Sequence, residues 1–138
     1  MQDIQTQTLT HGYGITCRAD AHSQAKIVSI ANNIIKDCKR KAVDLHGGEK
    51  VNIVNNLLKN CMVAGIYAYT YIVENLVHDI NIVGNQIIEC SYANNKLGAL
   101  CVGALTDTQD ETILEKNVNV TNNLFENCGG ETNGIIFI

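Results

Sequence analysis

Ionisable and aromatic residues alternate with apolar residues in two short segments, 42–46 and 65–69. The first segment carries Asp44 and His46, and the second carries Tyr67 and Tyr69. A carboxylate and an imidazole can exchange protons near neutral pH, so Asp44 and His46 are the candidate catalytic acid/base pair. Tyrosine combines a flat apolar ring with a hydroxyl group, which suits the face of a sugar. Tyr67 and Tyr69 are therefore candidate substrate-binding residues.

Two charged residues extend this candidate site. Arg18 occupies the position of His46 in an earlier segment, and a guanidinium can hold the carboxylate of an acidic sugar at two points. Glu49 follows closely after His46. The cysteines show no zinc-like spacing with one another or with histidine, so we expect neither a metal nor another cofactor. The alternative reading of all these residues is a solvated strand face without a binding role.

An internal repeat determines how these residues are positioned. Four segments align without gaps: 30–38, 53–61, 82–90 and 120–128. Each contains an asparagine and, five residues later, a cysteine; the two columns are Asn33, Asn56, Asn85, Asn123 and Cys38, Cys61, Cys90, Cys128. Repeats of this length that cannot bury an apolar side alone are typical of stacked solenoids.

Alternating apolar residues before and after these segments predict strands. A second strand follows each cysteine and opens with a small residue. We expect its inward positions to be Ile15/Cys17, Val43/Leu45, Ile66/Ala68, Ala99/Cys101 and Ile135/Phe137. The outward positions are then Thr16/Arg18, Asp44/His46, Tyr67/Tyr69, Leu100/Val102 and Ile136/Ile138. Apolar outward residues in the later coils predict a covered face, such as a subunit contact.

These patterns predict an all-β fold, a single parallel β-helix domain over residues 1–138 with about four to five coils. The asparagine column is expected to form a hydrogen-bonded ladder at a turn, and the cysteines to be reduced core residues. An α-helical repeat is the rival, because residues 51–61 also satisfy helical spacing. We see no capping unit, which predicts a fragment or ends covered by partners.

Composition argues against other classes of protein. The net charge is −4 with no concentrated basic patch, so we expect no nucleic-acid partner. The N-terminus has no signal-peptide pattern, and no apolar stretch approaches the roughly 20 residues of a membrane helix. We therefore expect no membrane partner and no secretion signal.

The repeated coils, followed by Gly-Ile-x-x strands, resemble the right-handed parallel β-helix proteins of the pectin-lyase-like superfamily. Residues 11–15 and 40–46 are most similar to coils of phage tailspikes and tail fibres. The resemblance implies a polysaccharide-recognising module of a virion tail, folded in the host cytoplasm and assembled as a homotrimer. If it is an enzyme, it would be a polysaccharide lyase or glycoside hydrolase. The alternatives are a non-catalytic structural or adhesion shaft, and a secreted polysaccharide lyase or epimerase.

Overall fold

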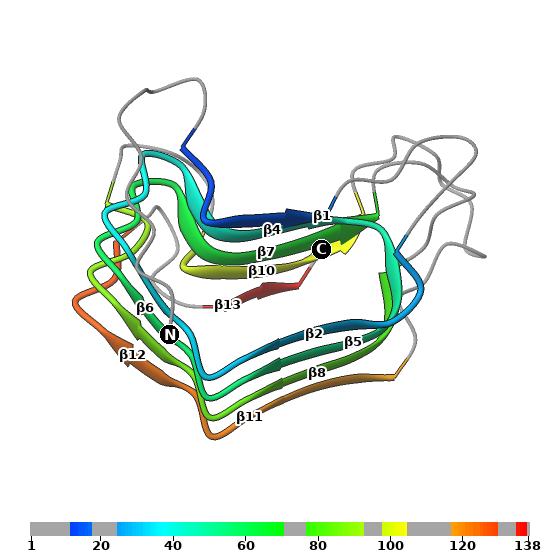
Figure 1. Cartoon of the computed structure of the whole chain (residues 1–138). Helices are drawn as coiled ribbons and strands as arrows, with labels where there is room; N and C mark the ends of the chain where they lie inside the picture. The colour runs from blue at the N-terminus through cyan, green and yellow to red at the C-terminus, as the bar shows by residue number, and fades with distance from the viewer. Residues whose placement is uncertain are drawn as a thin grey trace.

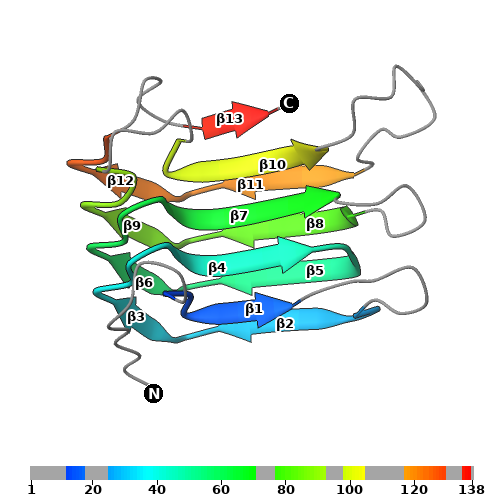
Figure 2. The same ribbon diagram turned by 90° about the horizontal axis from the view of Figure 1, so that it is seen from above.

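The protein is a parallel β-helix. The computed structural model describes residues 12–17, 25–70, 77–92, 98–104, 117–129 and 135–137, which form thirteen strands and no helix, so none that could cross a membrane. The chain coils through three sheets in turn, so that strands distant in sequence lie on top of one another (Figures 1 and 2). The predicted all-β fold is confirmed, and the α-helical rival is wrong.

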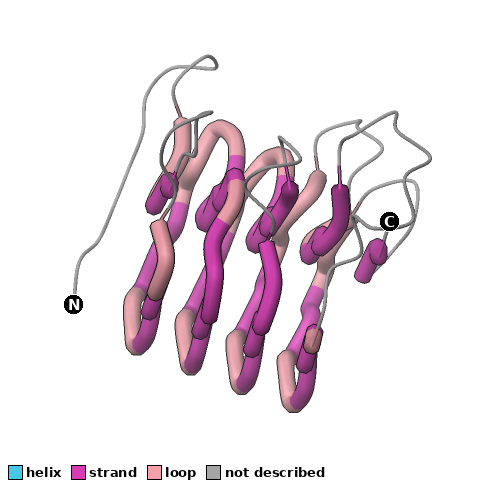
Figure 3. Tube along the Cα trace, turned by 90° about the vertical axis from the view of Figure 1, so that its right-hand side faces the viewer, coloured by secondary structure: helices cyan, strands magenta, loops and turns pink. Residues whose placement is uncertain are grey.

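Every strand pairs with its neighbours in parallel. The first sheet contains β1 (Ile15–Cys17), β4 (Lys41–His46), β7 (Ala64–Thr70), β10 (Leu100–Ala104) and β13 (Ile135–Phe137). The second contains β2 (Val28–Ala31), β5 (Gly48–Val54), β8 (Val77–Val83) and β11 (Val118–Thr121). The third contains β3 (Ile34–Lys36), β6 (Leu57–Lys59), β9 (Gln86–Ile88) and β12 (Leu124–Glu126). Figure 3 shows the coils as successive layers of one stack.

The corner between the second and third sheets explains why asparagines occur in pairs. The first residue of each pair adopts a left-handed conformation, with φ of 59° at Asn32, 54° at Asn55 and 55° at Asn122; Gly84 takes this place in the third coil with φ of 67°. Asparagine and glycine tolerate this conformation better than other residues. The corner therefore turns within one residue, and the next residue points inward.

The inward residues form the predicted ladder. The side-chain amide nitrogen of Asn33 donates to Asn56 Oδ1 at 3.0 Å, and that of Asn56 donates to Asn85 Oδ1 at 2.9 Å. Asn85 donates in the same way to Asn123 Oδ1 at 2.9 Å. Each of these oxygens also accepts the backbone N–H of the preceding asparagine. The ladder thus ties four coils together at one corner.

Aliphatic side chains fill the space between the sheets, as the alternation predicts. Val51, Ile53 and Leu58 have no exposed surface, and the same is true of Ile82 and Ile87 one coil later. The predicted inward residues Val43, Leu45, Ile66 and Ala68 all belong to this core. The cysteine column also lies in it, with Cys38, Cys61 and Cys90 buried and Cys128 half-buried, and no disulfide joins the six cysteines.

The predicted register is wrong by one residue in β10. Leu100 pairs with Ile66, Cys101 with Tyr67 and Val102 with Ala68, so Leu100 and Val102 belong to the core and Cys101 does not. A one-residue shift exchanges the two faces of a strand, and this one buries two aliphatic side chains. Leu100 and Val102 therefore form no apolar outer face. In β13, Ile135 pairs with Leu100, Ile136 with Cys101 and Phe137 with Val102, whereas Ile138 lies outside the described residues.

Candidate functional site

Four of the candidate residues share the outer face of the first sheet. The strand register pairs Asp44 with Tyr67 and His46 with Tyr69, and it pairs Tyr67 with Cys101 on the next strand. Lys41 joins them through its contacts with Asp44 and Tyr67. We call these side chains the outer cluster: Lys41, Asp44, His46, Tyr67, Tyr69 and Cys101.

Lys41 and Asp44 form a buried ion pair in this cluster. The lysine Nζ donates to Asp44 Oδ1 at 2.8 Å, and the two side chains are 7% and 0% exposed. The Lys41 ammonium also lies 3.4 Å from the centre of the Tyr67 ring, a close cation–π contact. Burial lowers the pKa of Lys41, while the hydrogen bond to Asp44 opposes that shift. Charge is thus held here at a considerable desolvation cost.

His46 approaches the other oxygen of the same carboxylate. Its Nε2 lies 3.2 Å from Asp44 Oδ2, and its side chain is 19% exposed. Although buried, Asp44 Oδ2 has no directed hydrogen bond. Catalytic hydrogen bonds are often long or poorly aligned in the absence of substrate. His46 is therefore a partly accessible imidazole held against a buried carboxylate, which is the arrangement expected of a proton-transfer group.

The two tyrosines support the charged groups from the neighbouring strand. The rings of Tyr67 and Tyr69 stack with centres 4.5 Å apart and planes within 8°, and the residues are 4% and 2% exposed. Burial raises the pKa of Tyr67, with further contributions from Tyr69, Cys101 and Asp44. Burial likewise raises the pKa of the Cys101 thiol. Both groups are therefore neutral at physiological pH.

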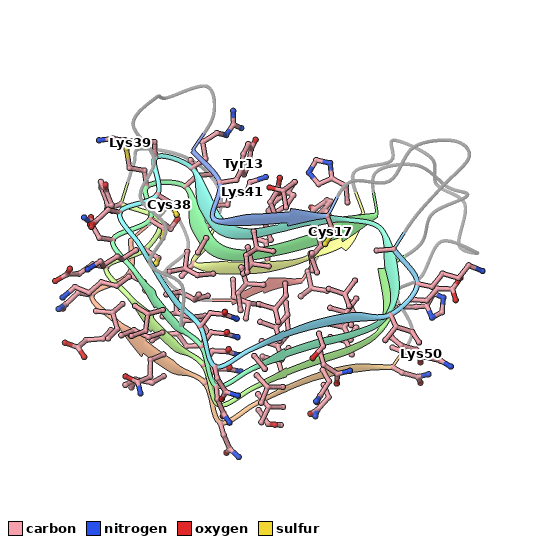
Figure 4. The ribbon with its side chains drawn as sticks, in the orientation of Figure 1. Tyr13, Cys17, Cys38, Lys39, Lys41 and Lys50 are labelled. Carbon is pink, nitrogen blue, oxygen red and sulfur yellow. The ribbon has the colours of Figure 1, made fainter. Side chains whose placement is uncertain are left out.

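Tyr13 and Arg40 form an edge to the outer cluster that sequence reasoning missed. The Arg40 guanidinium lies 5.2 Å from the centre of the Tyr13 ring, and Lys41 Nζ lies 5.8 Å from it. Figure 4 shows Tyr13 and Lys41 together on the outside of the first sheet. Arg40 Nε is buried and has no hydrogen-bond partner among the described residues. The available signal was the pair of adjacent basic residues at the start of the Asp44 strand, with Arg40 just before β4 and Lys41 as its first residue.

The remaining predicted site residues lie elsewhere. Glu49 belongs to β5 in the second sheet, where its carboxylate lies 3.9 Å from Lys26 Nζ, so the fold does not bring it into the outer cluster. Arg18 lies outside the described residues. Within the described ranges, no three histidine, cysteine or acidic side chains converge in a way that could hold a metal ion.

Comparison with known proteins identifies no relative: no family model, no curated protein and no solved structure matches the chain. The parallel β-helix is accordingly established by the sheets themselves. The likeness to pectin-lyase-like and tailspike proteins rests on the repeat pattern.

Proposed function

We propose that the protein is a polysaccharide-recognising β-helix module of the kind found in phage tailspikes, and that it binds an acidic glycan at the outer cluster. The observation that carries the proposal is the buried Asp44 carboxylate between Lys41 at 2.8 Å and His46 at 3.2 Å. Burial also lowers the pKa of Lys41, and clusters of ionisable groups that include a shifted pKa are enriched at functional sites.

The charged and aromatic groups of this face favour an acidic ligand. Arg40, Lys41 and His46 supply cationic or protonatable groups around one carboxylate, and Tyr13 adds an aromatic surface beside Arg40. A guanidinium binds a carboxylate with two hydrogen bonds, and an aromatic ring can pack on the apolar face of a sugar. Tyr67 and Tyr69 are buried, so their role in this proposal is to position Lys41 and His46.

If the module cleaves its ligand, elimination suits the cluster better than hydrolysis. Glycoside hydrolases commonly use two carboxyl groups, whereas the described cluster contains one, Asp44. The imidazole of His46, which lies 3.2 Å from the Asp44 carboxylate, is the group in this proposal that removes the proton beside a uronate carboxylate. The electron pair of that C–H bond becomes a C=C bond, the glycosidic C–O bond breaks, and the departing oxygen takes a proton from solvent.

The test is binding to an array of acidic and neutral bacterial polysaccharides, followed by titration of the best ligand against three variants. Arg40→Gln should weaken binding about ten-fold, because it loses a charge-assisted contact, and His46→Gln should weaken it about five-fold, because it loses a hydrogen bond from the imidazole. Lys59→Gln is the control, since Lys59 is an exposed lysine on the third sheet whose ammonium lies 3.6 Å from Glu89. Unchanged affinity in both site variants would refute the glycan site.

Burial of Asp44, Tyr67 and Tyr69 favours a second candidate, a non-catalytic shaft whose outer face makes subunit contacts. In that case the protein should form a homotrimer in a virion tail. Light scattering after gel filtration measures the mass of the assembly. A trimer that dissociates in Arg40→Gln but binds no polysaccharide would favour the shaft over the glycan module.

A further inference from the structure

A groove runs along the corner between the second and third sheets, away from the outer cluster. It has a volume of about 400 Å³ and crosses three successive coils. The residues that matter to its chemistry are Asn32, Asn55, Gly84, Ile34, Leu57 and Gln86. Strand register aligns Ile34, Leu57 and Gln86 in one file, and Asn32, Asn55 and Gly84 follow the paired ends of β2, β5 and β8. The groove therefore follows the axis of the stack.

The carboxamides on this groove are free to bind a ligand. Asn32, Asn55 and Gln86 are exposed, and within the described chain their side chains make no hydrogen bond. The amides on the outer face of the second sheet behave differently, since Asn81 donates to Asn52 at 3.3 Å and Asn119 donates to Asn81 at 2.7 Å. Carboxamides that make no hydrogen bond within the protein can bond to a ligand. On neighbouring coils they are about 4.8 Å apart, the spacing between paired strands, which suits a ligand that repeats along its length.

We propose that this corner groove binds a neutral glycan chain lying along the β-helix axis. The side chains that line it include no charged residue, so it offers nothing to an acidic sugar. Carboxamides can donate to and accept from hydroxyl groups, while Ile34 and Leu57 supply apolar surface for the sugar rings. At Gly84, which replaces the asparagine of the neighbouring coils, the Asn55 carboxamide oxygen lies against the place where a Cβ would be, so Asn55 packs on the glycine.

An extended peptide fits the groove less well. Peptides commonly bind such folds by pairing with a free strand edge. Here the corner backbone is already paired between coils, with Asn32 N donating to Val54 O at 3.1 Å and Leu57 N donating to Asn33 O at 2.9 Å. Side chains supply the remaining contacts, and these suit hydroxyl groups.

The experiment records amide NMR spectra of the full chain while cellohexaose, maltohexaose or mannohexaose is added to about 10 mM, a range that detects weak sugar binding. We expect the side-chain NH₂ signals of Asn32, Asn55 and Gln86 to shift with at least one hexasaccharide. Absence of shifts with all three, or shifts confined to other residues, would overturn the proposal.

The deciding variant is the double change Asn32→Gly and Asn55→Gly. Glycine keeps the left-handed corner, as Gly84 already does, while removing two carboxamides. Affinity for the neutral hexasaccharide should fall about 30-fold, the loss of two hydrogen bonds. Asn52→Ser is the matched control, because it removes a carboxamide from a different face and places there the residue found at Ser29 in the same file. Equal affinity in wild type and double variant refutes the groove.

This inference takes from the proposed function only the idea that the ligand is a glycan. The corner groove and the outer cluster are separate sites, so either proposal can fail without the other. Binding of an acidic polysaccharide should depend on Arg40 and His46 and be unaffected by the double change Asn32→Gly and Asn55→Gly. Binding of a neutral hexasaccharide should show the reverse dependence.

Discussion

The asparagine ladder and the outer cluster both bury polar groups, but they satisfy them to different degrees. In the ladder, Asn56 Oδ1 accepts two hydrogen bonds from Asn33, and its amide nitrogen donates to Ile30 O and to Asn85 Oδ1. In and beside the cluster, Asp44 Oδ2 and Arg40 Nε are buried and form no hydrogen bond within the part of the chain that the structure describes. The two regions lie on the inside and the outside of the same coils.

This difference marks the ladder as architectural and the outer cluster as the region for which another explanation is needed. A fully satisfied polar network holds a unique structure, whereas an unsatisfied buried polar atom costs free energy and calls for another explanation. In the ladder, each coil supplies the missing partner of the previous one. In and beside the outer cluster, Asp44 Oδ2 has only the 3.2 Å approach of His46 Nε2, and Arg40 Nε has no hydrogen-bond partner among the described residues.

The largest predicted effect comes from leaving a charge unpaired in the outer cluster. Asp44→Ala removes the carboxylate that holds Lys41, and the free energy of unfolding should fall by about 3–5 kcal/mol. Urea denaturation followed by circular dichroism measures this change.

The control replaces both partners with apolar residues of similar size. Lys41→Met combined with Asp44→Leu should bring stability back to within about 1 kcal/mol of wild type, because no buried charge remains. If the double variant were as unstable as Asp44→Ala, the ion pair would belong to the architecture, and the contrast with the ladder would disappear.

Breaking the ladder should have the next largest effect. Asn56→Ala leaves hydrogen-bonding groups of Asn33 and Asn85 without partners in a site that is 1% exposed, and should cost about 2–3 kcal/mol in denaturant unfolding. Asn123→Ala is the comparison, since Asn123 is half-buried in the last coil of the ladder and water can replace part of its bonding. Equal losses at the two positions would contradict a ladder whose strength depends on burial.

The smallest effect concerns the pH dependence of stability. The pKa of Tyr67 in the folded protein is raised above its ordinary value of 10.0, so the unfolded chain releases this proton first. Stability from Tyr67 is present below about pH 10 and declines as pH rises further. Urea midpoints measured from pH 8 to 11 should therefore fall less steeply in Tyr67→Phe than in wild type.

Lys41 has the opposite effect on the pH dependence of stability in both proteins. Its pKa is lowered in the folded state, so the unfolded chain binds the Lys41 proton more strongly. Stability from this group therefore rises with pH up to the ordinary lysine pKa of 10.5. The comparison of wild type with Tyr67→Phe cancels that contribution. Parallel curves for the two proteins would show that Tyr67 is not buried against the cluster.

Much of the fold could be predicted because the repeat is visible in the sequence. Residues that recur at one place in every coil, such as Asn56 and Cys61, must stack if the coils stack. The period of two then assigned Val43 and Leu45 to the inside and left Asp44 and His46 on the other face. In β10 the same reasoning failed, because either Gly98 or Ala99 can serve as the small residue before the strand. The structure aligns Ala99 with Gly65, and burial of Leu100 and Val102 favours that choice.

The candidate site was predictable in part. Asp44 and Tyr67 lie on neighbouring strands of one sheet, so their pairing follows from the repeat. Lys41 could not be found by alternation, since it lies three residues before Asp44 and an odd separation implies opposite faces of a regular strand. Glu49 follows His46 closely in sequence, but a corner intervenes and places it in the second sheet.

The sequence by itself determined the stacking of coils, because repeated asparagines, cysteines and aliphatic residues can all be buried and bonded together only in a solenoid. Tertiary structure decided which side chains meet across a corner and how deeply each is buried. These depend on turn geometry and on neighbouring strands, which local periodicity does not encode. That is why the ladder could be predicted from Asn56 and its counterparts, while the partners of Asp44 had to be seen.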